Sequence, residues 1–217
     1  MTSTTVRSTP STDTVARRAR SGAIGGGLWL LLPAVWAAAE LGEQEFGSLG
    51  FVAVAVADWI FLVLAPVLIV VGHTALRASL GPGVSRIGRT GVALGALGLG
   101  AVAVGNGIEV GSMSLGGGEV AVGHAIFLVG FLVSIVGGVL VGSTVVRRFQ
   151  DVLARTAGWL LVLALPLGAG IGFLGSMLAP ENDAAFWAAI SVPTGAAWLL
   201  LGRYLLIRHR GAADVRA

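Results

Sequence analysis

Cysteine and lysine are absent from this sequence, and charged residues of any kind are scarce. The 217 residues include 14 basic residues, all of them arginine, and 11 acidic residues, so only 12% of the chain is charged. Soluble domains are usually about a quarter charged. The missing cysteine excludes a disulfide framework, a thiolate metal site and a cysteine nucleophile.

Apolar residues take the place of the missing charge. Hydrophobic side chains make up 55% of the sequence, 34 residues are glycine, and the mean hydropathy is +0.89. This composition excludes soluble-enzyme folds as well as disordered and collagen-like chains. It indicates a polytopic membrane protein.

Six apolar stretches follow a polar N-terminal segment. They lack the two-residue alternation of barrel strands, and each is long enough to cross about 30 Å of hydrocarbon as a helix. We therefore predict an all-α bundle of six transmembrane helices over residues 21–210, between a disordered tail at 1–20 and a C-terminal tail at 211–217. The stretches lie at 21–40, 50–76, 88–110, 120–146, 157–178 and 185–207.

The arginines are confined to the N-terminal tail, the connections after the second and fourth stretches, and the C-terminal end. The other three connections carry only acidic charge. By the positive-inside rule, both termini are expected in the cytoplasm. Arginine without lysine is typical of a GC-rich bacterial genome, so we expect the membrane to be a bacterial inner membrane. The arginines are Arg7, Arg17, Arg18 and Arg20; Arg77, Arg86 and Arg89; Arg147, Arg148 and Arg155; and Arg203, Arg208, Arg210 and Arg216.

A short pattern recurs at the ends of the even-numbered stretches. Residues 71–77 are repeated as 141–147, with a weaker echo at 201–207. The repeat predicts three parallel helical hairpins related by a pseudo-threefold axis along the membrane normal, with Gly72 and its counterparts Gly142 and Gly202 at one depth.

The first stretch has an alternative interpretation. Residues 37–39 are three alanines before Glu40, which resembles the cleavage site of a secretory signal peptide. The length of the stretch and its place in the repeat favour a transmembrane helix.

Glycines and prolines predict how the helices pack. Gly91 and Gly95 are one example of small residues four apart, a spacing that lets helix backbones approach closely. Prolines inside four stretches predict kinks. Such kinks either form part of a gate or have no function, because proline is common in membrane helices. These prolines are Pro33, Pro66, Pro166 and Pro193.

Ionisable and amide side chains gather near the acidic side of the predicted bundle. A charge in hydrocarbon is costly, so each one is a candidate functional group. The repeat counterparts of Asp58 and His124 are apolar, so the polar groups are distributed asymmetrically, which favours one outward-facing polar pocket. The candidate pocket residues are Asp58, Asn106, Glu109, His124 and Glu40.

The chemistry of such a pocket has three interpretations. Asp58 and His124 at similar depth suit a proton or cation relay, and two carboxylates with one histidine would also be a minimal metal site. The structural alternative is that Asp58 only bonds to Asn106, His124 or the backbone. A two-histidine haem is excluded because His73 and His124 are expected at opposite membrane faces. The sequence assigns no cofactor, no metal and no catalytic residue.

A second candidate site lies on the arginine side. Basic side chains there would suit a phosphate or an anionic lipid headgroup, or they are solvated arginines that only fix the topology. The candidate contacts are His73, Arg77, Arg89 and Arg147.

Three features of the sequence carry a family resemblance. They are residues 39–42, the single His124 ahead of Phe127 and Phe131, and the helix pairs that end in arginine. The chain resembles a group of small six-helix prokaryotic membrane proteins known only as a domain of unknown function. The resemblance implies a six-helix fold and no activity. The additional histidines of lipid-hydrolase relatives are missing here.

The sequence therefore favours an inner-membrane protein that binds or moves a small molecule, lipid or ion through an outward-facing polar pocket. One alternative is an accessory or assembly subunit of a membrane complex, and a second is an intramembrane enzyme. The expected partners are the bilayer, a small-molecule or lipid ligand, and another membrane protein or a second copy of the chain. The net charge is +3, but the basic residues mark one side of the membrane, so this charge does not indicate binding to nucleic acid.

Overall fold

All regular secondary structure in the described part of the protein is helical. A computed structural model describes residues 11–39, 45–178 and 183–214, with side chains up to residue 210. Strands are absent from these segments. In chain order the elements are α1 (Thr12–Ala39), α2 (Leu49–Asp58), the π-helix η1 (Trp59–Leu64), α3 (Ala65–Leu80), α4 (Arg86–Ser114), α5 (Ala121–Arg148), α6 (Val152–Val162), α7 (Ala164–Leu178) and α8 (Ala184–Asp214).

The helices extend further into both predicted tails than the sequence indicated. The prediction of disorder over 1–20 is wrong from Thr12 onward, because α1 begins there. Val15 and Ala19 are buried, so this turn gains apolar contacts that composition alone does not reveal. Residues 1–10 lie outside the described segments. At the other end, α8 continues to Asp214, so most of the predicted tail at 211–217 is helical.

Five helical segments are long and apolar enough to cross a membrane without a break. A bent pair of helices would form a sixth membrane span if the two helices are counted together. The five are α1, the continuous series from α2 to α3, α4, α5, and α8 over Ala184–Arg210. The pair α6 and α7 passes the same test together but bends by 68°. The break follows from Pro166, which has no N–H to donate to the carbonyl of Val162 four residues earlier.

The other predicted kink sites behave differently from one another. Pro33 and Pro193 lie inside continuous helices. Pro66 lies two residues after the end of η1, where the backbone widens to the i→i+5 pattern, as in the bond from the Ala65 N–H to the Ile60 carbonyl. Proline in these helices therefore produces three outcomes: a bend, a π-helix or no break.

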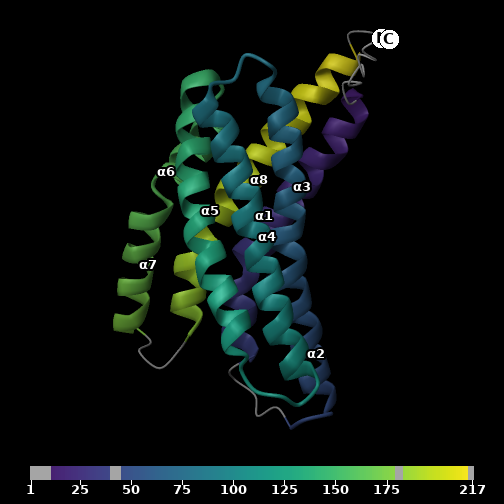
Figure 1. Cartoon of the computed structure of the whole chain (residues 1–217), viewed down its shortest axis with the longest axis vertical. Coiled ribbons are helices and arrows are strands. Elements are labelled where there is room, and N and C mark those ends of the chain that lie inside the picture. Colours follow the sequence, from purple (N-terminus) through teal and green to yellow (C-terminus); the bar gives the residue numbers. More distant parts are fainter. Residues whose placement is uncertain (1–10, 40–44, 179–182, 215–217) are drawn as a thin grey trace, which may run out of the picture.

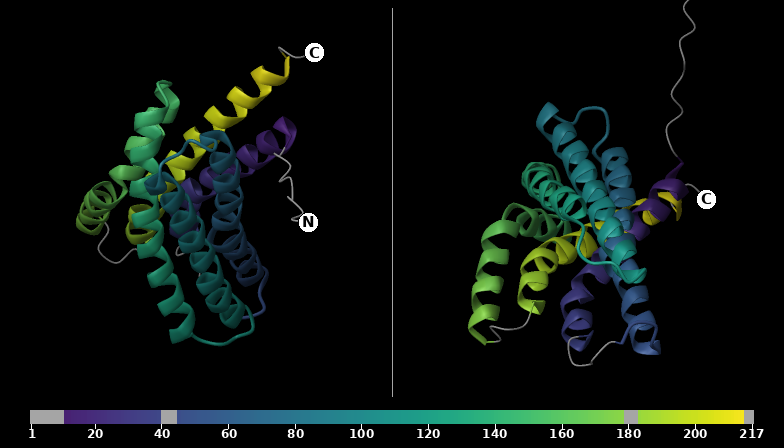
Figure 2. Two further views of the ribbon diagram at one scale, coloured as in Figure 1. Left: turned by 45° about the horizontal axis from the view of Figure 1, so that its top comes forward. Right: turned by 60° about the horizontal axis from the view of Figure 1, so that its bottom comes forward.

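The helices form a closed ring of neighbours. α1 packs on α3, α3 on α4, α4 on α5, α5 on α6, α6 on α8, and α8 again on α1 (Figure 1). α7 leaves this ring after the bend and packs mainly on α8 (Figure 2). Apart from α7, the order of these helices around the ring follows their order in the chain, and the last helix joins the first.

Close approach between the helices depends on glycine. A Cβ added to Gly26 would lie 2.5 Å from the Leu199 nitrogen of α8, and one added to Gly98 would lie 2.7 Å from the Gly130 carbonyl of α5. Along the antiparallel pair α4–α5 these glycines recur every seven residues on both helices, which keeps one seam in contact over its length. The seam consists of Gly91, Gly98 and Gly105 on α4 and Gly123, Gly130 and Gly137 on α5.

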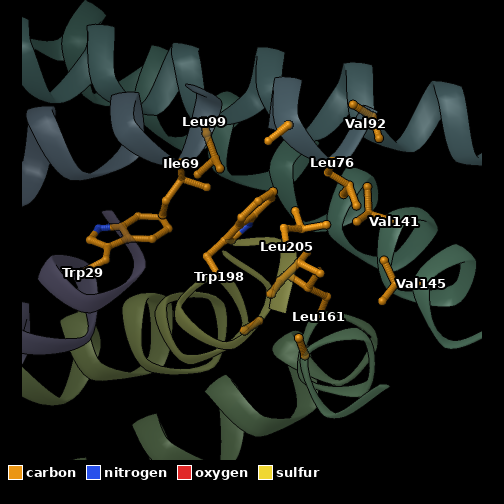
Figure 3. Close-up of a cluster of buried hydrophobic side chains, with 14 of the residues drawn as sticks. Trp29, Ile69, Leu76, Val92, Leu99, Val141, Val145, Leu161, Trp198 and Leu205 are labelled. Atoms are coloured by element: carbon orange, nitrogen blue, oxygen red, sulfur yellow. The ribbon is translucent and has the colours of Figure 1, made fainter. Parts of the chain in front are cut away.

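The core is built around two tryptophans. Trp29 of α1 is 1% exposed and Trp198 of α8 is 2% exposed. Figure 3 shows both among aliphatic side chains that come from α3, α4, α5 and α6. The repeat-related Gly72 meets Gly22 of α1 and the Trp198 ring, whereas Gly142 meets Gly158 of α6 and Gly202 meets α1. Gly72 and Gly202 thus both serve close contacts with α1, whereas Gly142 serves a contact with α6.

The two ends of the bundle differ in charge. We call the end that carries the start of α1, the end of α8 and the α3–α4 and α5–α6 connections the arginine end (top of Figure 1). The opposite end, which carries the start of α2, the α4–α5 connection and the start of α8, is called the acidic end. It carries Glu45, Asp58, Glu109, Glu119 and Asp183 in the described segments.

Candidate functional site

The candidate residues at the acidic end do not meet in one pocket. Glu40 lies outside the described residues. Glu109 and His124 face each other, Asn106 bonds to the backbone of η1, and Asp58 lines a separate groove. The prediction of one polar pocket is therefore replaced by three different local arrangements.

Glu109 and His124 form a cross-helix pair at the acidic end. The Oε1 atom of Glu109 lies 3.3 Å from Nδ1 of His124, within ion-pair distance but without hydrogen-bond alignment. The Glu109 side chain is 18% exposed and the His124 side chain 54% exposed. The pair joins the end of α4 to the start of α5, with Oε1 of Glu109 buried and the His124 ring partly exposed.

Asn106 has a structural partner instead of a ligand. Its side chain is 3% exposed, and Nδ2 donates a 2.9 Å hydrogen bond to the Leu62 carbonyl in η1. That carbonyl lies four residues before Pro66, so the normal helical donor is missing. Asn106 replaces this donor from the neighbouring helix, which explains a buried amide at this depth.

Asp58 lines an apolar groove between α1 and α2. The groove, which we call the Asp58 groove, has a volume of about 610 Å³. Its walls include Trp36, Ala39 and Val54, and Asp183 lies at its other side. The half-buried Asp58 makes no hydrogen bond or ion pair with any described residue, so neither Asn106 nor His124 is its partner.

Asp183 also borders a second groove, which sequence reasoning missed. This lateral groove lies between α5, α7 and α8 and has a volume of about 470 Å³. Its walls are apolar, with Ser176 and Asp183 toward the acidic end and Thr194 deeper in the bundle. The groove exists because α7 bends away from the ring, so Pro166 was the sequence signal that could have located it.

Aromatic side chains fill the interior between these two grooves. The rings of Trp36 and Trp187 lie 5.0 Å apart, and Trp187 lies 6.1 Å from Phe127. Phe131 stacks on Phe127 at 6.2 Å. The cluster joins α1, α5 and α8 through contacts between aromatic rings.

His73 is a core residue and does not belong to an anion site at the arginine end. Its side chain is 3% exposed, Nδ1 bonds to the Ile69 carbonyl at 3.1 Å, and its ring lies 4.2 Å from that of Trp198. A Cβ on Gly95 would lie 2.5 Å from Nε2, so α4 approaches the imidazole closely. The predicted contact of His73 with an anion is wrong because the histidine faces the bundle axis.

A small chamber lies beside His73. It has a volume of about 20 Å³, room for one water, and it shares Ile135, Ala164 and Thr194 with the lateral groove. Its polar borders are His73, Ser134 and Thr194. The lateral groove therefore ends next to the only histidine that the bundle buries among its described residues.

The predicted arginines divide between two clefts at the arginine end. Arg77 and Arg89 line a cleft of about 730 Å³ together with Arg18 and His209. Arg147 lines another cleft of about 710 Å³, the Arg147 cleft, with Arg148, Arg208, Ser79, Ser85 and Thr144. Described carboxylates line neither cleft.

The described residues contain no group of three histidine, cysteine or carboxylate side chains close enough to share a metal ion. The metal arrangement of two carboxylates and one histidine is therefore not formed by Asp58, Glu109 and His124. No protein-family model matches the chain, and no curated protein or solved structure is found to be similar to it.

Proposed function

We propose that the chain crosses a bacterial inner membrane six times, with the arginine end in the cytoplasm. The five apolar helical segments and the bent pair α6–α7 supply the spans. The distribution of arginine between the two ends supports this orientation by the positive-inside rule. Three parallel hairpins with pseudo-threefold symmetry, and membership of the six-helix family that the sequence resembles, are part of the same proposal.

Within this topology we propose that the protein binds, and through binding moves, a small amphiphile that carries a positive charge. The single observation that carries this proposal is Asp58, a carboxylate without a protein partner among the described residues, in an apolar groove of about 610 Å³. An ionised carboxylate in such surroundings needs a counter-charge.

The groove has features that suit such a ligand. Its apolar walls of alanine, valine and tryptophan would accept a hydrocarbon body, while Asp58 and Asp183 place acidic groups at its borders. No described basic residue lines it. A cation would therefore be attracted where an anion would be repelled.

The test measures binding of tetraphenylphosphonium, an apolar cation, to the purified protein in lipid nanodiscs by equilibrium dialysis. We expect Asp58→Asn to weaken binding about tenfold to a hundredfold, because a contact with a charged group contributes about 1.5–3 kcal/mol. Neutral triphenylphosphine oxide should bind both proteins equally.

Glu109→Gln is the matched control. It removes one carboxylate at the same end of the bundle, but Glu109 does not line the groove. Equal losses in Asp58→Asn and Glu109→Gln would show that only the overall negative charge attracts the cation. Unchanged binding in Asp58→Asn would disprove the proposed site.

The accessory-subunit interpretation is the second candidate, supported by α7. This helix packs mainly on α8 and exposes Phe173, Leu174, Met177 and Leu178. A partner helix from another membrane protein would cover such a surface. Purification in a mild detergent followed by cross-linking and mass spectrometry would distinguish a stoichiometric partner from an isolated bundle.

A further inference from the structure

The Arg147 cleft brings together arginines from distant parts of the chain. Arg147 and Arg148 end α5, whereas Arg208 lies near the end of α8. Like charges repel, so three of them around one cleft of about 710 Å³ favour an anion between them. Described carboxylates that would neutralise them do not line the cleft.

Arg208 is held in place by aromatic neighbours. Its guanidinium lies 5.2 Å from the centre of the Phe149 ring, and Nη1 donates to the Tyr204 hydroxyl at 3.4 Å. These contacts use one face and one nitrogen of the guanidinium. Its other N–H groups remain available, and a planar fork of donors matches phosphate oxygens.

Neutral donors complete the same cleft. Ser85 caps α4 by accepting from the Gly88 N–H at 3.1 Å, and Ser85 and Ile87 both line the cleft. The first N–H groups of a helix have no carbonyl partner within it, and they carry partial positive charge. Ser143 adds a hydroxyl to the lining, whereas the Ser79 hydroxyl donates to the Ala75 carbonyl at 2.9 Å and lies 2.7 Å from Nε2 of His209. Arginines, hydroxyls and a helix start are the usual components of a phosphate site.

We propose that the Arg147 cleft binds a phosphate group at the arginine end of the bundle, carried either by an anionic phospholipid headgroup or by a soluble phosphate compound. The cleft is lined by different residues from the Asp58 groove and lies at the opposite end. The proposal is therefore independent of ligand binding at Asp58.

The test compares two triple variants of the full chain in a non-ionic detergent. One variant is Arg147→Gln, Arg148→Gln and Arg208→Gln. The control is Arg17→Gln, Arg155→Gln and Arg203→Gln, which removes the same charge from exposed positions that do not line the cleft. The probes are dihexanoyl phosphatidylglycerol, dihexanoyl phosphatidylcholine and inorganic pyrophosphate, with binding followed by native mass spectrometry and calorimetry.

We expect the cleft variant to lose at least tenfold in affinity for an anionic probe, and the control to change less than twofold. Loss confined to phosphatidylglycerol identifies a lipid headgroup, whereas loss for pyrophosphate identifies a soluble phosphate compound. Three results would overturn the proposal: equal losses in both variants, unchanged affinity in the cleft variant, or failure of the unaltered protein to bind either anionic probe.

A single variant covers the case in which the triple variant does not fold. Arg208→Lys keeps the charge but removes the planar fork, so it should still lower affinity severalfold. Unchanged affinity in Arg208→Lys and in the single variants Arg147→Gln and Arg148→Gln would equally overturn the proposal.

Discussion

At the scale of single residues, similar polar side chains serve different purposes. Asn106 satisfies a carbonyl that proline leaves without a donor, His73 packs in the core, and Asp58 lines a groove without a partner among the described residues. All three are polar residues inside apolar stretches, so their positions in the sequence make them equivalent candidates. Their neighbours in space distinguish them.

The bond from Asn106 to Leu62 leads to a prediction about stability. Asn106→Leu should lower the free energy of unfolding by about 1–3 kcal/mol, because the Leu62 carbonyl loses its donor inside the bundle. Pro66→Ala restores a backbone N–H four residues after Leu62. The cost of Asn106→Leu should therefore be smaller in the Pro66→Ala background.

Unfolding in mixed detergent micelles would measure both costs in a double-mutant cycle. If Asn106→Leu costs the same in the unaltered protein and in the Pro66→Ala background, the bond does not compensate for proline.

At the scale of the elements, backbone contact decides how the helices pair. The α4–α5 seam has no large side chains at its closest points, and a methyl group on Gly137 would collide with the backbone of Gly95. Inside a bilayer the hydrophobic effect does not drive helices together, because lipid tails are as apolar as the side chains. Close packing therefore becomes the main source of helix association. The glycines therefore determine which faces meet.

A comparison of two glycines on α4 tests this statement. Gly98→Ala should destabilise the protein by about 1–3 kcal/mol, because its Cβ would lie 2.7 Å from the Gly130 carbonyl and force the helices apart. Gly100→Ala is the control, since no atom of a neighbouring helix lies within 4 Å of the new Cβ. Alanine favours a helix over glycine, so Gly100→Ala should be neutral or slightly stabilising.

The measurement is the midpoint of thermal unfolding in detergent for each variant. Equal midpoints for Gly98→Ala and Gly100→Ala would contradict the role of the seam.

At the scale of the whole molecule, the ring of helices separates two chemically different ends. Grooves with apolar walls and carboxylates open near the acidic end, whereas clefts lined by arginines open at the other. Aromatic rings and a tightly packed core lie between them. The two proposed sites can therefore be tested separately.

The proposed topology leads to a labelling prediction. Because the chain has no cysteine, single cysteines can be introduced without background. Gly118→Cys in the α4–α5 connection should react with a membrane-impermeant thiol reagent in spheroplasts, and Gly83→Cys in the α3–α4 connection should react only after permeabilisation. Neither substitution introduces a Cβ closer than 3.9 Å to another residue.

Reaction of Gly83→Cys but not of Gly118→Cys in intact spheroplasts would reverse the orientation. Reaction of both would contradict a single span between the two connections.

The sequence alone determined the helical class, the apolar segments and the separation of charge. These properties depend on composition and local periodicity, because a long apolar helix satisfies its own backbone hydrogen bonds whatever its neighbours are. The same local reasoning placed the prolines, and at Pro166 it correctly predicted a bend.

Only the tertiary structure decided which polar residues meet. Asp58 and Asn106 lie on adjacent spans, but the rotation of each helix about its axis turns one toward the α1–α2 groove and the other toward η1. That rotation depends on glycine contacts and side-chain shape across several helices, which no single segment encodes. For the same reason His73 is buried, while Arg208 lies beside Arg147 from another part of the chain.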